Sequence, residues 1–310
     1  MSPVADCPQL NNPALCGPRI IAFVAVVSPR CLERLMGNHL YRCITLKGAK
    51  MGNRYRTVAA ILLSGALSAA AVASDLAATP TPRVALLELF TSEGCNSCPP
   101  TDRWVSALPR PRLVPEKLVV LAFHVDYWNY LGWPDRFSQA LFTQRQQARV
   151  RSNGLRTAYT PQLLLNGRDY RERGDIDAQV ARVQGQAARI QLLLNNERKG
   201  ADVKAKVFIQ PLATAPSEPM ELYLAVYENN LETQVKAGEN RGQRLRHDYV
   251  VRSLIGPIAV ATNQATRWET PIALHAQWKI ENLGLAAFVQ STGSGEVLQA
   301  TAQPLRNREF

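Results

Sequence analysis

Cysteine is scarce in the greater part of this sequence: residues 74–310 contain only two, Cys95 and Cys98. Small secreted proteins that are held together by disulfides carry many more, so a disulfide-stapled scaffold is excluded for this part of the chain. The other four cysteines all precede residue 74: Cys7, Cys16, Cys31 and Cys43. In an exported chain, a single Cys-x-x-Cys pair indicates a thiol–disulfide site.

A hydrophobic run long enough to be a convincing transmembrane helix is also missing. The apolar segment 58–72 is short and rich in alanine. It follows Arg54 and Arg56 and ends in the small-residue site Ala71-Val72-Ala73, which is the pattern of a Sec signal peptide. Residues 51–73 are therefore predicted to be a signal peptide. The mature protein is expected in the periplasm or outside the cell, without a stable membrane anchor after cleavage.

A signal peptide normally begins at the N-terminus, so the residues before Met51 need an explanation. The favoured one is that residues 1–50 are a mis-assigned upstream extension and that translation starts at Met51. The alternative is a metal site made of the four early cysteines. This alternative is weak because their spacing contains no Cys-x-x-Cys knuckle.

Strong net charge and nucleotide-binding motifs are absent from residues 74–310. The whole sequence has a net charge of +11, and about +5 of it stays on these residues, because the first 73 hold eight basic and two acidic side chains. No basic–aromatic stripe is present, so nucleic acid is not an expected partner. No Ser-His-Asp order, phosphate loop or dinucleotide fingerprint is found either, and no cofactor is predicted.

What is present in residues 80–190 is an alternation of predicted strands and helices. Near-continuous apolar runs at 84–90 and 118–125 are typical of strands that are buried on both faces. A third strand is predicted at 162–165, before the turn Asn166-Gly167. Helices are predicted at 101–108 (after Pro99-Pro100), 135–149 and 175–190. This alternation predicts an α/β domain whose first crossover is parallel.

From residue 191 onward the pattern changes to short segments in which apolar and polar residues alternate. Glycine and proline separate these segments, as between the strands of an antiparallel sheet. Residues 191–310 are therefore predicted to form a β-sandwich domain of roughly seven or eight strands. The expected fold class is α/β, with an α/β domain at 80–190 followed by this sandwich.

The Cys-x-x-Cys pair lies between the first predicted strand and the first predicted helix. The free N–H groups and the dipole at a helix N-terminus favour a thiolate. Cys95 is therefore predicted to be the more exposed member of the pair and the attacking thiol, and Cys98 the buried thiol that resolves a mixed disulfide. Glu93 would oppose thiolate formation if its carboxylate lay close. A copper site with His124 as a further ligand is an alternative, but the cysteine spacing argues against it and no metal is predicted.

The segment Tyr159–Gly167 has the sequence YTPQLLLNG, in which Thr-Pro directly precedes an apolar strand. It resembles the cis-proline loop of thioredoxin-fold proteins. The resemblance implies a thioredoxin-like domain in which Pro161 is cis and faces the cysteine pair, while Thr160 presents backbone groups to a bound substrate. Two features depart from thioredoxin itself: no Trp precedes Cys95, and Asn-Ser stands where thioredoxin has Gly-Pro. Generic reductase activity is therefore not implied.

Three longer segments resemble a family of secreted bacterial proteins catalogued as domain of unknown function 1223. These segments are Glu88–Asp102, His124–Asp135 and Gly238–Arg252. Together the resemblance covers essentially all of the mature chain. It implies a thioredoxin-like fold and supplies no substrate.

Four aromatic residues follow the second predicted strand, at the edge where parallel α/β sheets bind ligands. Trp128 and Trp133 are candidates for lining a substrate groove beside the thiols, and packing over the sheet edge is the alternative. His124 is a candidate proton shuttle, and a hydrogen-bonded structural histidine with Asp126 as its partner is the alternative. The segment 238–252 is predicted to be a solvated hairpin loop rather than an anion site.

Two functions stay open on this evidence. The first is an exported thiol–disulfide oxidoreductase that acts on protein or small-molecule thiols and disulfides through Cys95 and Cys98, with Thr160 and Pro161 in its substrate loop. The second is a non-catalytic periplasmic binding or scaffold protein with a structural disulfide. A Cys95 sulfur that is exposed and faces Pro161 favours the first function, whereas a fully buried pair favours the second.

Overall fold

The computed structural model describes residues 81–108, 116–171, 175–199 and 202–305. The predictions for residues 1–50 and for the signal peptide at 51–73 lie outside the described residues. All described residues belong to one unit, Ala78–Phe310.

The strands are β1 (Ala85–Thr91), β2 (Leu118–His124), β3 (Gln162–Leu165), β4 (Arg168–Asp169), β5 (Ile190–Lys199), β6 (Asp202–Pro211), β7 (Met220–Glu228), β8 (Leu231–Gln234), β9 (Arg244–His247), β10 (Val250–Val260), β11 (Thr266–Ile272), β12 (Leu283–Ser291) and β13 (Val297–Pro304). The helices are α3 (Pro99–Ser106), α4 (Ala140–Ser152) and α5 (Ile176–Gln184), with short 3₁₀ helices η1 (Asn129–Leu131) and η2 (Ile280–Asn282).

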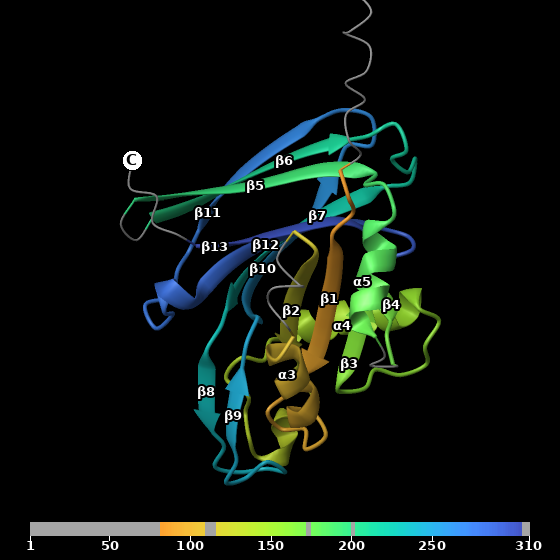
Figure 1. Cartoon of the computed structure of the whole chain (residues 1–310). Coiled ribbons are helices and arrows are strands. Elements are labelled where there is room, and N and C mark those ends of the chain that lie inside the picture. Colours follow the sequence, from red (N-terminus) through yellow and green to blue (C-terminus); the bar gives the residue numbers. More distant parts are fainter. Residues whose placement is uncertain (1–80, 109–115, 172–174, 200–201, 306–310) are drawn as a thin grey trace, which may run out of the picture. The chain divides into compact units, whose positions relative to one another are not determined.

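A main sheet of eight strands has the order β13-β12-β7-β10-β2-β1-β3-β4 (Figure 1). β1 and β2 are parallel, with α3 between them in the chain, which confirms the predicted parallel crossover. Every residue of both strands is buried, because side chains cover the two faces of this parallel pair. The α/β prediction is thus confirmed in a coarse form, as a mixed sheet with helices.

Alternate residues of β1 point to opposite faces of the sheet and enter two separate cores. On one face Leu87 packs in a cluster with Val105 of α3 and Val180 of α5. On the other face Leu86 packs in a cluster with Phe142 of α4. β1 is therefore fixed from both sides, and the segment that follows it leaves a rigid strand end.

Two predicted helix boundaries differ from the structure. α4 begins at Ala140 and not at Asp135, because the Asp135 carboxylate accepts a hydrogen bond from the Phe137 N–H at 2.9 Å and its carbonyl accepts one from the Ser138 N–H, which forms a separate turn. The helix predicted to run to Ile190 ends at Gln184, and Ile190 instead opens β5.

The strands after residue 190 do not all form a separate sheet. β7, β10, β12 and β13 extend the main sheet, and β10 meets β2 in parallel where Val250 pairs with Ala122. The order β11-β6-β5 forms a smaller antiparallel sheet, which lies across one end of the main sheet and shares a hydrophobic core with β7 and β12 (Figure 1). Strands from both sides of the boundary predicted at 190/191 take part in the main sheet. The division into two domains stays a prediction.

Candidate functional site

The cysteine pair lies where the C-terminal end of β1 passes into α3. Cys98 is the N-cap residue of α3, and Pro99 and Pro100 occupy the first turn, where their missing N–H groups cost no hydrogen bond. The Cys98 N–H donates to the Cys95 carbonyl at 3.2 Å, so Cys95 stands in the turn that leads into the helix. The predicted order of strand, cysteine pair and helix is confirmed.

The pKa values of the two thiols are shifted in opposite directions. The pKa of Cys95 is lowered from 9.0 to about 6, first by a hydrogen bond from Cys98 and then, against the effect of burial, by Ser97 and Thr160. The pKa of Cys98 is raised, first by burial and then by the neighbouring Cys95 and the Asp102 charge. At neutral pH Cys95 is therefore mostly the thiolate, the reactive form, and Cys98 is the thiol.

The Thr160–Pro161 loop stands directly beside Cys95. The Cys95 Sγ lies 3.9 Å from the Thr160 carbonyl oxygen, and the Thr160–Pro161 peptide bond is cis, as the resemblance implied. The indole N–H of Trp128 donates to the Thr160 Oγ1 at 2.8 Å. Trp128 therefore holds this loop in place beside the thiol.

Both cysteines are fully buried, with 0% exposure, so the prediction that Cys95 is the more exposed member is wrong. The 235–243 segment between β8 and β9 closes over the backbone of the Cys95 turn. The buried Asn240 side chain donates to the Glu93 and Cys95 carbonyls at 2.8 and 3.0 Å, and the Glu239 carboxylate accepts from the Asn96 N–H at 3.0 Å. We refer to residues 235–243 as the hairpin tip.

His124 is paired with a buried carboxylate. The His124 Nδ1 lies 2.6 Å from the Asp135 Oδ2, and both side chains are fully buried. Burial by itself lowers the pKa of His124, but Asp135, Asp102 and Glu93 raise it above its ordinary value. Asp126, considered as the partner of His124 from the sequence, instead accepts from the Thr143 hydroxyl.

Trp133 anchors the residue that precedes the cysteine turn. Its indole N–H donates to the Glu93 Oε2 at 2.9 Å. The other carboxylate oxygen of Glu93 lies 3.3 Å from the His247 Nε2. Glu93 is thus held by Trp133 and His247, and the main causes of the lowered pKa of Cys95 are other groups: Cys98, Ser97 and Thr160.

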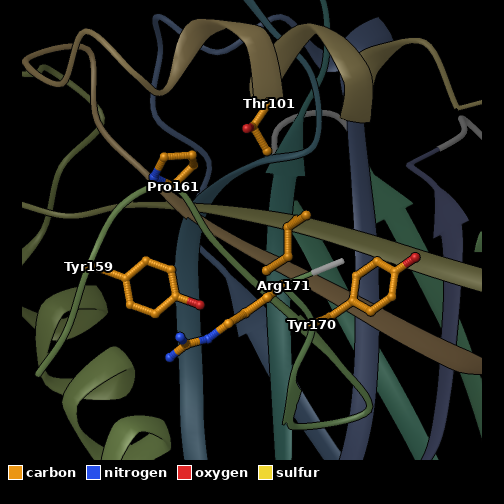
Figure 2. A pocket seen from close by; sticks show the side chains of 6 residues that line it. Thr101, Tyr159, Pro161, Tyr170 and Arg171 are labelled. Carbon is orange, nitrogen blue, oxygen red and sulfur yellow. The ribbon is translucent and has the colours of Figure 1, made fainter. Parts of the chain in front are cut away.

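A pocket of about 260 Å³ lies next to Pro161, between α3 and strand β3. Figure 2 shows Tyr159 and Tyr170 on its two sides, with Pro161 and Thr101 above Arg171. The Arg171 guanidinium lies over the Tyr159 ring at 5.2 Å and pairs with Asp169 at 2.7 Å. The pocket therefore offers aromatic and apolar surface with one cation that is already paired.

A metal-binding cluster is not found in the part of the chain that the structure describes, where no group of three His, Cys, Asp or Glu side chains is arranged to hold an ion. Among the same residues, no helix combines the length and the apolar character that crossing a membrane requires.

Comparison with known proteins gives the family of this chain. The model described as "Protein of unknown function (DUF1223)" matches residues 86–290, which is more than half of the chain. The chain belongs to the DUF1223 family. No curated protein matches it.

Two solved structures resemble this DUF1223 chain over most of its described residues. A crystal structure of an Agrobacterium tumefaciens protein is 26% identical, with a TM-score of 0.55, and the match covers 74% of this chain and 97% of that one. HBP35 of Porphyromonas gingivalis is 17% identical, with a TM-score of 0.56, and the match covers 74% of this chain and 77% of that one. The second likeness concerns the fold alone.

Reasoning from the sequence missed several residues of this candidate site. Asn240 and Glu239 of the hairpin tip were predicted to lie in a solvated loop. No function was predicted for Asp102 or His247. The only signal in the sequence was that residues 238–252 form one of the three segments that resemble the family. The contact of this segment with the cysteine turn joins residues more than 140 positions apart, such as Asn240 and Cys95, which local patterns do not reveal.

Replacing Asn240 with alanine is expected to expose Cys95 more often. The variant loses two buried hydrogen bonds worth about 1 kcal/mol each, so alkylation of Cys95 by iodoacetamide should become roughly 5- to 30-fold faster. The rate is followed by mass spectrometry of the Cys95 peptide. Gln234→Ala is the matched control, because the Gln234 side chain donates to the Gly242 carbonyl within the same hairpin rather than to the cysteine turn. An Asn240→Ala rate within twofold of the wild-type rate would show that the hairpin tip does not limit access.

Proposed function

We propose that this protein is an exported thiol–disulfide oxidoreductase with a thioredoxin-like fold. Cys95 is the nucleophile, Cys98 is the resolving thiol, and Thr160 and Pro161 contact the substrate. The signal peptide predicted at residues 51–73 supports export. The substrates are disulfides or thiols of proteins or small molecules, and no cofactor takes part.

One observation carries the proposal: the Cys-x-x-Cys pair stands at the N-terminus of α3 with the Cys95 Sγ 3.9 Å from the Thr160 carbonyl oxygen, and its two thiols have pKa values shifted in opposite directions. The pKa of Cys95 is lowered to about 6 and that of Cys98 is raised. A permanent structural disulfide needs no such difference, whereas thiol–disulfide exchange requires a thiolate that attacks and a thiol held in reserve.

The chemistry balances without any further group. The Cys95 thiolate attacks one sulfur of a substrate disulfide, the substrate S–S bond breaks, and the other substrate sulfur leaves as a thiolate that takes a proton from water. Cys98 then loses its proton and attacks the Cys95 Sγ, which releases the second substrate thiolate and forms the Cys95–Cys98 disulfide. Two electrons pass from the cysteine pair to the substrate, and the reverse sequence oxidises a dithiol.

Burial of Cys95 means that exchange needs a local opening. The Cys95 Sγ becomes accessible when the hairpin tip separates from the Glu93 and Cys95 carbonyls, or when Trp128 releases Thr160. Openings of this kind cost less than global unfolding. The burial of Cys95 therefore limits the rate of exchange but does not prevent exchange.

Trapping of mixed disulfides tests the proposal. The Cys98→Ala protein, expressed with export and quenched with acid, is expected to accumulate Cys95-linked adducts that disappear on reduction. Cys95→Ala and the double variant should give none. If Cys98→Ala gives no adduct although its Cys95 is alkylated at the normal rate, the oxidoreductase proposal fails.

The full burial of both cysteines favours a second candidate, a non-catalytic binding or scaffold protein whose cysteine pair is structural. Structural disulfides have reduction potentials below about −300 mV, more reducing than those of exchange proteins. A potential in that range, measured by equilibration with a dithiol buffer and combined with an empty trapping experiment, would support this candidate.

A further inference from the structure

A buried glutamine of α4 lies behind the Thr160–Pro161 loop. Gln146 is 0% exposed and stands one helical turn beyond Phe142, on the face of α4 that packs against the main sheet. Burying an amide in such a place is costly unless the amide is hydrogen-bonded. The presence of Gln146 is therefore explained by the partners that it binds.

The Gln146 side chain joins the two residues on either side of Thr160–Pro161. Its Nε2 donates to the Tyr159 carbonyl at 2.8 Å and to the Gln162 Oε1 at 2.9 Å. Its Oε1 accepts from the Tyr127 hydroxyl at 3.1 Å. Both ends of the amide thus have partners, and the two donated hydrogen bonds hold the loop before and after its proline.

The hydrogen bonds continue from the loop to β4. The Gln162 Nε2 and the Tyr159 hydroxyl both donate to the Asp169 Oδ1 at 2.8 Å. The other oxygen of Asp169 pairs with Arg171, and these two are the charged groups joined to the network. Tyr159 lines the 260 Å³ pocket, and it is fixed at its backbone by Gln146 and at its hydroxyl by Asp169.

The same loop reaches the reactive thiol. The peptide group that Gln146 binds is the one that joins Tyr159 to Thr160, and the next carbonyl oxygen, that of Thr160, lies 3.9 Å from the Cys95 Sγ. The Trp128 indole holds the Thr160 side chain, whereas Gln146 holds the backbone that precedes it. The position of the Thr160 carbonyl relative to the sulfur therefore depends on Gln146.

We propose that Gln146 is a positioning residue for thiol–disulfide exchange: it sets the Thr160 backbone beside Cys95 so that a peptide substrate can lie along the loop while the thiolate attacks. The inference rests on the proposed oxidoreductase function and deepens it. Gln146 touches no reacting atom and acts through Thr160. A displacement of about 1 Å at a reacting centre can cost about 10²-fold in rate, so the loss of Gln146 is expected to slow exchange.

Two coloured probes separate positioning from thiol reactivity in the full chain. In the first probe, nitrothiophenol forms a mixed disulfide with the cysteine of a short alanine-rich peptide. In the second probe, it forms one with mercaptoethanol, which has no peptide backbone. The Cys95 thiolate attacks the peptide or mercaptoethanol sulfur, the S–S bond breaks, and nitrothiophenolate leaves with the electron pair.

The Gln146→Met variant is expected to distinguish the two probes. Release from the peptide probe should be about tenfold slower than in the wild type, because the loop no longer holds the peptide in place. Release from the mercaptoethanol probe should change by less than about twofold, because it needs the thiolate but not the loop. Gln147→Met is the matched control, since Gln147 is the next residue of α4 and is exposed. Its rates should equal those of the wild type.

The Gln146→Glu variant adds a readout that a merely structural role would not move. A carboxylate cannot donate to the Tyr159 carbonyl, whereas the protonated acid can. The peptide-probe rate of Gln146→Glu, divided by the wild-type rate at the same pH, should therefore fall as pH rises through the pKa of the introduced acid, which burial raises. The same ratio for Gln146→Met should not depend on pH.

A milder variant keeps the inference testable if Gln146→Met does not fold. Tyr127→Phe keeps the ring and removes only the hydroxyl that donates to the Gln146 amide. Release from the peptide probe should then be roughly threefold slower, as expected for one lost hydrogen bond. Release from the mercaptoethanol probe should stay at the wild-type rate.

The outcomes are distinct. A wild-type protein that releases nitrothiophenolate from neither probe overturns the oxidoreductase proposal and this inference with it. A wild-type protein that reacts with both probes, combined with folded Gln146 variants that match the Gln147→Met control, overturns only the role of Gln146. Equal slowing with both probes also overturns that role, because it would mean that Gln146 supports the surroundings of Cys95 and not the substrate loop.

Discussion

The Asp135→Ala variant is expected to lose about 3–5 kcal/mol in the free energy of unfolding, which is the usual cost of removing one partner from a buried ion pair. Asp135 accepts hydrogen bonds from His124 at 2.6 Å, from the Glu93 N–H at 2.8 Å and from the Phe137 N–H at 2.9 Å. Its loss leaves all three donors in the interior without this acceptor. In a chain of this size, the thermal midpoint should fall by roughly 10 °C.

The difference between wild-type protein and this variant should depend on pH in a defined way. Burial by itself raises the pKa of Asp135, but His124 and the backbone donors hold it below its ordinary value of 3.8. The Asp135 contribution is therefore present above pH 3.8 and is lost as pH falls through the lowered pKa. The pKa of His124 is raised above 6.5, so its contribution is present below pH 6.5 and is lost as pH rises through the raised pKa.

Urea unfolding at several pH values measures this window. The difference in free energy should be largest between the two ordinary pKa values and should shrink on both sides. Asp126→Ala is the control in the same loop, since Asp126 bonds to the Thr143 hydroxyl and should cost only about 1 kcal/mol. A flat pH dependence, or equal losses in both variants, would contradict the assigned charge pair.

A second large loss is expected when Glu88 or Arg145 is removed alone. Glu88 of β1 is fully buried and pairs with Arg145 of α4 at 2.7 Å. The Arg145 guanidinium also lies 4.8 Å from the ring centres of Tyr223 and Phe288, on strands β7 and β12. Either single alanine variant should lose about 3–5 kcal/mol, because an unpaired charge is left in the core.

A double-mutant cycle distinguishes this charge effect from lost packing. The cycle compares Glu88→Leu, Arg145→Met and the double variant with the wild type. The double variant should recover at least half of the loss that either of these substitutions causes alone, since a buried pair adds little over a well-packed apolar pair. Chemical unfolding at neutral pH gives the four free energies. Additive losses would mean that the two residues stabilise the protein independently.

Prediction from the sequence succeeded where the signal was local. The apolar runs of β1 and β2 predicted buried parallel strands because covered faces leave no place for polar residues. Pro99-Pro100 marked the start of α3 because proline lacks the N–H that the first turn leaves unpaired. Prediction was least exact at helix ends. The Asp135 side chain accepts hydrogen bonds from the Phe137 N–H and from His124, and α4 begins only at Ala140.

By itself, the sequence determined that two cysteines meet at a strand end before a helix and that a Thr-Pro loop belongs near them. The tertiary structure alone decided that Cys95 is buried, that His124 pairs with Asp135, and that Asn240 and His247 reach the cysteine turn from the C-terminal part. The physical reason is range. Periodicity and turn chemistry act over a few residues, whereas burial and proton affinity depend on groups that only the folded chain brings together.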